Sequence, residues 1–140
     1  MKSYVKIAVL LLFVLLAGES FSQTPEVSEK RNYVVITSNI AQITPIVETA
    51  KMLAKEDGSK FGELQVIICG KTVTDLVQQD KIESLVTLAE QAGVKIFACG
   101  FSLNKFKVNE DAIPKVIGVV ENGLLYNFQL QKKGYLSIAL

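Results

Sequence analysis

Short runs of β-branched residues alternate with longer segments whose apolar residues recur at helical spacing, and this alternation continues from residue 33 to residue 139. A continuous run such as Tyr33–Thr37 is typical of a strand buried on both faces, as in a parallel sheet. Parallel strands need crossover connections, which the helical segments between them supply. The pattern therefore predicts an α/β fold with helices on both faces of a parallel sheet. The expected strands are Tyr33–Thr37, Leu64–Cys69, Val94–Ala98, Val116–Val120 and Tyr135–Ala139.

The segments between these strands carry helix signals. Apolar residues recur at helical spacing from residue 43 to residue 54, with Thr44 as a candidate N-cap and Pro45 in the first turn. Asp57-Gly58 is expected to end this helix. Further helices are expected from Asp80 to Gly93 and from Glu121 to Lys133, with short helical segments at Thr72–Val77 and within Ser102–Ile113.

The N-terminal segment has the layout of a secretory signal. Two lysines precede the uncharged apolar run Ile7–Ala17, and Ser20 and Ser22 stand third and first before the expected cleavage site. The run is shorter than the roughly 20 apolar residues that a membrane span needs. An uncleaved N-terminal anchor is the alternative. We expect a periplasmic or secreted protein with a signal peptide over residues 1–22, a flexible lead over 23–31 and one domain over 32–140.

Charge and residue usage exclude several kinds of chemistry. The chain has 15 basic and 14 acidic residues, and loss of residues 1–22, with two Lys and one Glu, leaves 13 of each. No basic excess favours nucleic acid. Without any His, the chain has no Ser-His-Asp site, Cys-His site or His metal site. Its two cysteines are too few for a four-Cys zinc site and do not form a C-x-x-C pair. We therefore expect neither a metal nor a cofactor.

Both cysteines fall at the ends of expected strands, Cys69 after the second strand and Cys99 after the third. The carboxyl ends of parallel strands share one edge of the sheet, which is where ligands bind in open α/β folds. Cys99-Gly100 leads into a loop and a helix start. Free backbone N–H groups there, with a nearby cation such as Lys105, would stabilise a thiolate. The alternative is a buried cysteine that only packs.

The segment Cys69-Gly70-Lys71 has the same layout at the preceding strand. Gly70 permits a sharp turn, and Lys71 would meet an anionic ligand at the same edge. The alternative is a packed strand end with a solvated lysine. If the two strands are neighbours, the cysteines lie about 5 Å apart, within the range of a disulfide. Such a bond would either block the reactivity of the Cys99 thiol or make the pair a redox switch.

Four segments resemble, in this order, the DsrE/DsrF-like family of sulfur-relay proteins: Leu64–Gly70, Ile82–Leu88, Ala92–Leu103 and Leu130–Tyr135. The resemblance extends over roughly residues 32–140. It implies a three-layer α/β/α domain with a five-stranded parallel sheet, in which the second and third strands are adjacent. It also implies assembly as a homotrimer or homohexamer. Several members carry persulfide sulfur on a cysteine at the end of the third strand, which is the position of Cys99.

Two positions depart from the family pattern. Cys69 stands where many relatives have His, and Lys71 stands where an apolar residue or Pro is common. A second thiol therefore replaces an imidazole beside Cys99.

These features together predict an exported sulfur-handling protein, a persulfide carrier or a sulfurtransferase-like protein. Cys99 is the expected sulfur acceptor and Cys69 a resolving or second thiol. The expected partners are sulfur donor or acceptor proteins, or small sulfur species. The alternatives are a non-catalytic oligomeric binding or assembly module with structural cysteines, and a redox sensor. The residues expected to bind an anionic sulfur species are Gly70, Lys71, Gly100 and Lys105.

Overall fold

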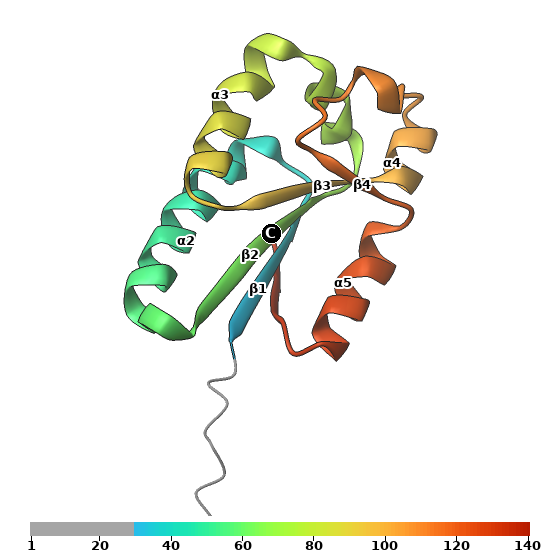
Figure 1. Ribbon diagram of the computed structural model, residues 1–140. Helices are drawn as coiled ribbons and strands as arrows, with labels where there is room; N and C mark the ends of the chain where they lie inside the picture. Colours follow the sequence, from blue (N-terminus) through green and yellow to red (C-terminus); the bar gives the residue numbers. More distant parts are fainter. Residues whose placement is uncertain (1–29) are drawn as a thin grey trace, which may run out of the picture.

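The computed structural model describes residues 30–140, which form one five-stranded sheet with all strands parallel (Figure 1). The order of the strands across the sheet is β4-β3-β2-β1-β5. The predicted α/β class is therefore confirmed, and the second and third strands are adjacent. The expected signal peptide and most of the expected lead lie outside the described residues. The strands are β1 (Arg31–Thr37), β2 (Phe61–Ile68), β3 (Lys95–Cys99), β4 (Gly118–Val120) and β5 (Leu136–Ala139).

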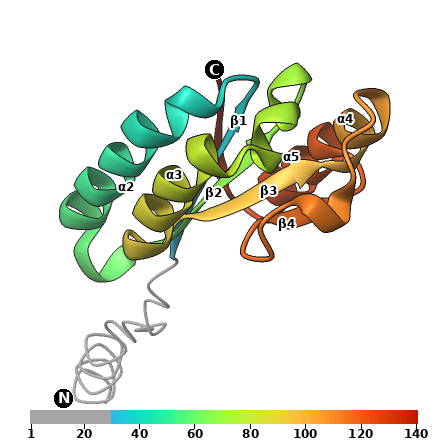
Figure 2. The ribbon, with the colours of Figure 1, turned by 90° about the horizontal axis from the view of Figure 1, so that it is seen from above.

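The helices make two layers around the sheet (Figure 2). Helices α2 (Ile43–Asp57) and α3 (Gln79–Gln91) pack on one face, and α5 (Gly123–Lys132) packs on the other against β1, β2, β3 and β5. The short helix α4 (Gly100–Lys105) continues directly from β3. Short 3-10 turns complete the chain: Ile40–Gln42, Gly58–Lys60, Lys71–Val77 and Glu110–Ala112.

Side-chain alternation along the strands builds a separate core on each face. In β2, Leu64, Val66 and Ile68 join the larger core beneath α2 and α3. Ile67 points the other way and packs with Leu130 of α5. Because consecutive residues face opposite sides, the residue after Ile68 in the chain points toward α5. The alternation of side chains along β2 therefore places the side chain of Cys69 on the face of the sheet that α5 covers.

The helix starts differ in detail from the sequence prediction. Thr44 is not the cap of α2, because the helix begins one residue earlier, at Ile43. Asn39 caps the preceding 3-10 turn instead, accepting the N–H of Ala41 at 3.0 Å. Asn122 caps α5 by accepting the N–H groups of the second and third helical residues.

Strand β4 is shorter than predicted and begins at Gly118 instead of Val116. A turn precedes it, in which the N–H of Ile117 donates to the carbonyl of Pro114 at 2.9 Å. Proline lacks an N–H to pair, so the chain reaches the sheet edge only after this turn. Within residues 30–140, no helix has the length and apolar character required to cross a bilayer.

Candidate functional site

The register of β2 and β3 brings the two cysteines together. Gln65 pairs with Lys95, and Ile68 pairs with Ala98, so the next position along each strand is a cysteine. Neighbouring strands lie about 4.8 Å apart, which makes Cys69 and Cys99 direct neighbours at the carboxyl edge of the sheet. Both are free thiols. The predicted juxtaposition of the two thiols is therefore present.

Cys99 is the more enclosed of the two, with 5 % of its surface exposed, whereas Cys69 is partly exposed. Cys99 ends β3 and is also the N-cap residue of α4. The backbone N–H of Gly123 donates to its sulfur, with a nitrogen–sulfur distance of 3.3 Å. Three elements, β3, α4 and α5, therefore meet at this one sulfur.

The surroundings of Cys99 favour its thiolate. Burial alone would raise the pKa of this thiol. The N–H of Gly123, the hydroxyl and N–H of Ser102, and the thiol of Cys69 act in the opposite direction, and the pKa lies below its ordinary value. Hydrogen bonds to a charged acceptor stabilise the charged form, so donors from three neighbouring residues oppose the effect of burial here.

Cys69 has the opposite character. Burial raises the pKa of its thiol to about 12, and the neighbouring negative charge at Cys99 adds to the effect. Two adjacent thiols do not ionise together, because the second charge would repel the first. Cys69 thus keeps its proton and donates it toward Cys99. The pair therefore consists of one thiol whose pKa is lowered and one whose pKa is raised.

Gly123 packs directly on the thiol pair. A Cβ atom placed on it would lie 2.6 Å from the Cys69 sulfur and 3.1 Å from the Cys99 Cβ. Its φ is not in the left-handed region, so the backbone conformation would accept any residue. Glycine is needed because α5 approaches the sheet too closely for a side chain.

The turn after β2 is linked to α4 by a buried hydroxyl. Gly70 adopts φ +74°, in the left-handed region that favours glycine, as predicted from its place in a sharp turn. Its N–H donates to the Ser102 hydroxyl oxygen at 2.9 Å. Gly100 has a different role: a Cβ there would lie 3.0 Å from the Glu121 carbonyl oxygen, so the glycine allows α4 to pack closely on the segment before α5.

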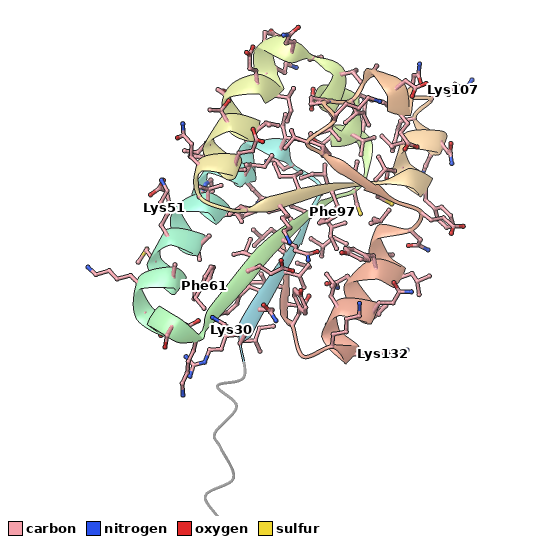
Figure 3. The ribbon with its side chains drawn as sticks, in the orientation of Figure 1. Lys30, Lys51, Phe61, Phe97, Lys107 and Lys132 are labelled. Atoms are coloured by element: carbon pink, nitrogen blue, oxygen red, sulfur yellow. The ribbon has the colours of Figure 1, made fainter. Side chains whose placement is uncertain are left out.

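The lysines do not provide the positive charge that the sequence suggested. Lys105 lies at the far end of α4 from Cys99, with its Nζ 5.7 Å from the centre of the Phe106 ring. Lys107, the next lysine, extends outward from the molecule (Figure 3). Lys71 is exposed at the start of its 3-10 turn. In residues 30–140, neither lysines nor carboxylates are among the main influences on the pKa of Cys99.

Two residues of the site were missed by the sequence reasoning, Ser102 and Gly123. Ser102 had a detectable signal, because it is the third residue after a strand-end cysteine, where a side chain reaches back to an N-cap. Gly123 had none, since its contribution is a backbone N–H that arrives from a helix 24 residues further along the chain.

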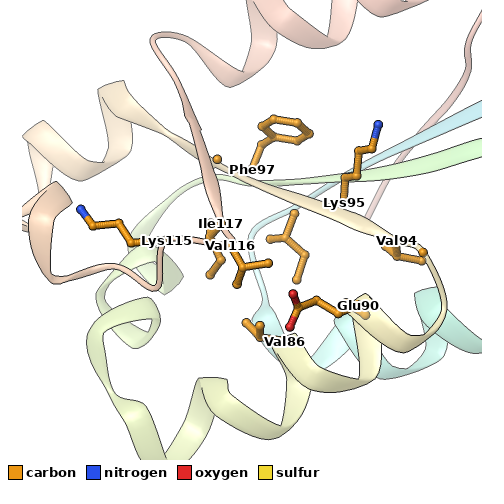
Figure 4. Close-up of a pocket in the computed structure, with 12 residues that line it drawn as sticks. Val86, Glu90, Val94, Lys95, Phe97, Lys115, Val116 and Ile117 are labelled. Carbon is orange, nitrogen blue, oxygen red and sulfur yellow. The ribbon is translucent and has the colours of Figure 1, made fainter.

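Two cavities in residues 30–140 lie away from the thiol pair, and the larger, of about 530 Å³, lies between α3 and the segment 111–115. A cavity of about 440 Å³ opens beside the free part of the β3 edge, between α3 and the segment before β4. In Figure 4 the carboxylate of Glu90 lies beside Val86 and Val116, whereas Lys95 and Lys115 extend away. Neither cysteine lines this cavity.

Exposed apolar side chains flank the thiol pair instead. Phe101 of α4 is 57 % exposed, and Leu124, Leu125 and Phe128 of α5 are 52–60 % exposed. We call these four residues the α4–α5 patch. The patch begins one residue after Gly100 on one side and one residue after Gly123 on the other, so it adjoins the thiols.

Comparisons with known proteins identify the fold but no family. No family model matches the chain, and no curated protein matches it. The solved structure of MTH1491 from Methanobacterium thermoautotrophicum, a protein of unknown function, is similar with a TM-score of 0.66 and 17 % identity, over 80 % of this chain and 100 % of that one. BT1422 from Bacteroides thetaiotaomicron, also a protein of unknown function, has a TM-score of 0.58 and 18 % identity, over 78 % and 94 %. At these identities the similarity establishes the fold alone.

Proposed function

We propose that this chain is a sulfur-handling protein of the DsrE/DsrF-like kind, which carries persulfide sulfur on Cys99. The observation that carries the proposal is the thiol pair at the carboxyl edge of the sheet, in which the N–H of Gly123 donates to the Cys99 sulfur. The lowered pKa of Cys99 supports its role, because the thiolate is the nucleophilic form of cysteine. The family resemblance of the sequence points to the same residue.

The proposed reaction is a sulfane-sulfur transfer. The Cys99 thiolate attacks the outer sulfur of a donor persulfide or hydropolysulfide, RS–SH. A bond forms between Sγ and the transferred sulfur while the RS–SH bond breaks, and RS⁻ leaves with the electron pair. The products are the Cys99 persulfide and a free donor thiolate. An acceptor thiolate reverses the same step, so no oxidant or metal is needed.

Cys69 acts here as a second thiol. Its pKa of about 12 keeps it protonated at neutral pH, so it supplies a hydrogen-bond donor and not a competing nucleophile. This is a narrower role than a resolving cysteine, which would have to attack as a thiolate. We therefore expect the persulfide on Cys99 to persist until an external acceptor arrives.

The proposal includes export, an oligomeric state and a partner. We propose that the chain is secreted or periplasmic and assembles as a homotrimer or homohexamer, as the resemblance implies. The exposed α4–α5 patch supports a contact next to the thiols, with a sister subunit or with a sulfur donor or acceptor protein. Light scattering coupled to size exclusion measures the mass of the assembly, and a monomer at micromolar concentration would contradict this part.

The second candidate is a non-catalytic binding or assembly module. The 5 % exposure of Cys99 favours it, because enclosed cysteines commonly serve packing only. In this case the thiols would resist labelling in the native protein, or would form a structural or redox-sensing disulfide. The adjacency of Cys69 and Cys99 permits such a bond sterically.

Intact-mass measurement separates the candidates. The native mature protein is incubated with polysulfide, and parallel samples are labelled with maleimide before and after reductant. The expected result is a mass gain of whole sulfur atoms that disappears in Cys99→Ser and persists in Cys69→Ser. Circular dichroism must show that both variants remain folded. Equal loading of Cys99→Ser and the parent would contradict the proposal. A parent that is two protons light and unlabelled until it is denatured and reduced would indicate the disulfide-containing module.

A further inference from the structure

A buried hydroxyl connects the ends of the two cysteine-bearing strands. Ser102 lies in α4 with 9 % of its surface exposed, and its oxygen accepts the N–H of Gly70 at 2.9 Å. Gly70 directly follows Cys69, in a turn that holds φ at +74°. One lone pair of the hydroxyl is therefore occupied by the β2 end of the site, and the hydroxyl proton remains to be donated.

The position of Ser102 directs that proton toward Cys99. Cys99 is the N-cap of α4, and Ser102 is the third helical residue. In an N-terminal capping arrangement, the side chain at this third position reaches back to the cap residue. Ser102 thus lies beside the Cys99 sulfur, and its hydroxyl and N–H are among the groups that lower the pKa of Cys99, together with the N–H of Gly123, which donates to that sulfur. The buried oxygen that accepts the Gly70 N–H therefore lies next to both halves of the thiol site.

We infer that Ser102 is a positioning residue of the thiol site: its hydroxyl donates to the Cys99 sulfur and accepts the Gly70 N–H. It thereby stabilises the thiolate and couples it to the turn that carries Cys69. The inference rests on the proposed function only for the role of Cys99 as the reacting thiol. It adds a side chain that neither the resemblance nor the cysteine pattern identified.

The polar groups that lower the pKa of Cys99 come from three of the elements around it, whereas β4 pairs with Cys99 through Val120, which is not ionisable. They are the Cys69 thiol after β2, the Ser102 hydroxyl and N–H from α4, and the Gly123 N–H from α5. Cys69 is the ionisable member of this set, and it stays protonated up to high pH. A change in the titration of Cys99 after substitution of Ser102 therefore reports the lost hydroxyl itself.

The test is the pH dependence of alkylation at each cysteine. Trypsin cleaves after lysine and places Cys69 in peptide 61–71 and Cys99 in peptide 96–105, so iodoacetamide labelling of each thiol is read separately by mass spectrometry. The variants are Ser102→Ala, the hydroxyl-retaining Ser102→Thr, and Ser137→Ala as a matched control. The Ser137 hydroxyl also donates to a side chain, the Asn127 oxygen at 2.8 Å, but on β5.

The expected result is an upward shift of the Cys99 midpoint in Ser102→Ala, on the order of one pH unit, or about tenfold less thiolate below the midpoint. Ser102→Thr should restore most of the parent midpoint, and Ser137→Ala should not move it. A merely structural Ser102 would lower the melting temperature of the Ala variant and leave the Cys99 midpoint in place. That outcome would overturn the inference.

A measurement on the unmodified protein covers the case in which Ser102→Ala does not fold. The amide proton shift of Gly70 should titrate with the Cys99 midpoint, because the Ser102 hydroxyl joins the two groups. It should move more than that of Phe101, whose N–H donates to the Glu121 carbonyl at 3.0 Å. A Gly70 amide that is insensitive to Cys99 ionisation would overturn the inference.

The two proposals fail in different ways. If Cys99 never loads sulfur but its midpoint depends on Ser102, the proposed function fails and the positioning role stands. If Cys99 loads sulfur and its midpoint is unchanged in a folded Ser102→Ala variant, the positioning role fails and the proposed function stands.

Discussion

The close approach of Gly123 to the thiol pair leads to a quantitative prediction for Gly123→Ala. The new Cβ would lie 2.6 Å from the Cys69 sulfur and 2.9 Å from the Ile67 Cγ2. Nonbonded heavy atoms prefer separations of about 3.5–4.0 Å, so each contact is too short by roughly 1 Å. Ile67 is fully buried, and Cys69 is the first residue after the end of the same strand. Neither side chain can move away without disturbing the sheet, so α5 must shift outward.

The free-energy change follows from two opposing effects. Overpacking of a close-packed interior costs about 1–3 kcal/mol. Alanine is a better helix former than glycine by at most about 1 kcal/mol, which offsets part of this cost. We therefore expect a net destabilisation of about 1–2 kcal/mol. For a domain of this size, each kcal/mol lowers the melting temperature by roughly 4 °C or more.

The same displacement affects chemistry. The Gly123 N–H donates to the Cys99 sulfur at 3.3 Å, and an outward shift of α5 lengthens this bond. Because this N–H lowers the pKa of Cys99, we expect the alkylation midpoint of Cys99 to rise in Gly123→Ala.

Urea unfolding and site-resolved alkylation measure the two effects on one preparation. Gln129→Ala is the matched control, since Gln129 is an exposed residue of α5 that lies outside the α4–α5 patch. Its stability should change by about 0.5 kcal/mol or less, and its Cys99 midpoint should not move. A Gly123→Ala variant with the stability and the Cys99 midpoint of the parent would refute the packing argument.

Three further predictions concern groups around the sheet. Because burial raises the pKa of Cys69 from 9.0 to about 12, the folded protein holds this proton more tightly than the unfolded chain, and stability falls as pH rises from about 9 toward 12. The free energy of unfolding in urea should therefore decrease less with pH in Cys69→Ser than in the parent over this range. Equal slopes for the two proteins would contradict the raised pKa of Cys69. Tyr126→Phe removes a hydroxyl that donates to the Gln65 Oε1 at 2.9 Å, and because Gln65 is only 5 % exposed, we expect a loss of about 1 kcal/mol in urea unfolding. A variant as stable as the parent would count against this bond. The Tyr33 hydroxyl donates to Asp57 and holds the pKa of that carboxyl below its ordinary value of 3.8 against the effect of burial. A carboxyl whose pKa is lower in the folded protein than in the unfolded chain stabilises the fold at pH values above its ordinary pKa. This stabilisation is lost as the pH falls through the pKa that the carboxyl has in the folded protein. The melting temperature of the parent should therefore drop more on acidification than that of Asp57→Asn. A steeper drop in the variant would reverse the assignment.

The fold was predictable because its signals are local. The β-branched run before Ser38 and the run before Gly70 match β1 and β2, and glycines such as Gly93 stand after the helix ends that they terminate. Period-2 and period-3.6 patterns are properties of neighbouring residues, so they can be read without tertiary contacts. The first residue of an element was harder to predict, because a cap or a turn competes there with the regular structure. Helix α2 begins before Thr44, and β4 begins two residues later than predicted.

The sequence by itself determined that both cysteines lie at strand ends, since the length of each apolar run sets where its strand stops. It also determined that the two ends share an edge, because parallel strands have the same direction. The ionisation of the thiols was decided only by the tertiary structure. It depends on which donors reach each sulfur, and these are a backbone N–H from α5 and a hydroxyl from α4. A backbone N–H is common to nearly every residue, so no sequence pattern marks the one at Gly123. The direction of Lys105 likewise follows from the helix that begins at Gly100, which carries the lysine away from the thiols.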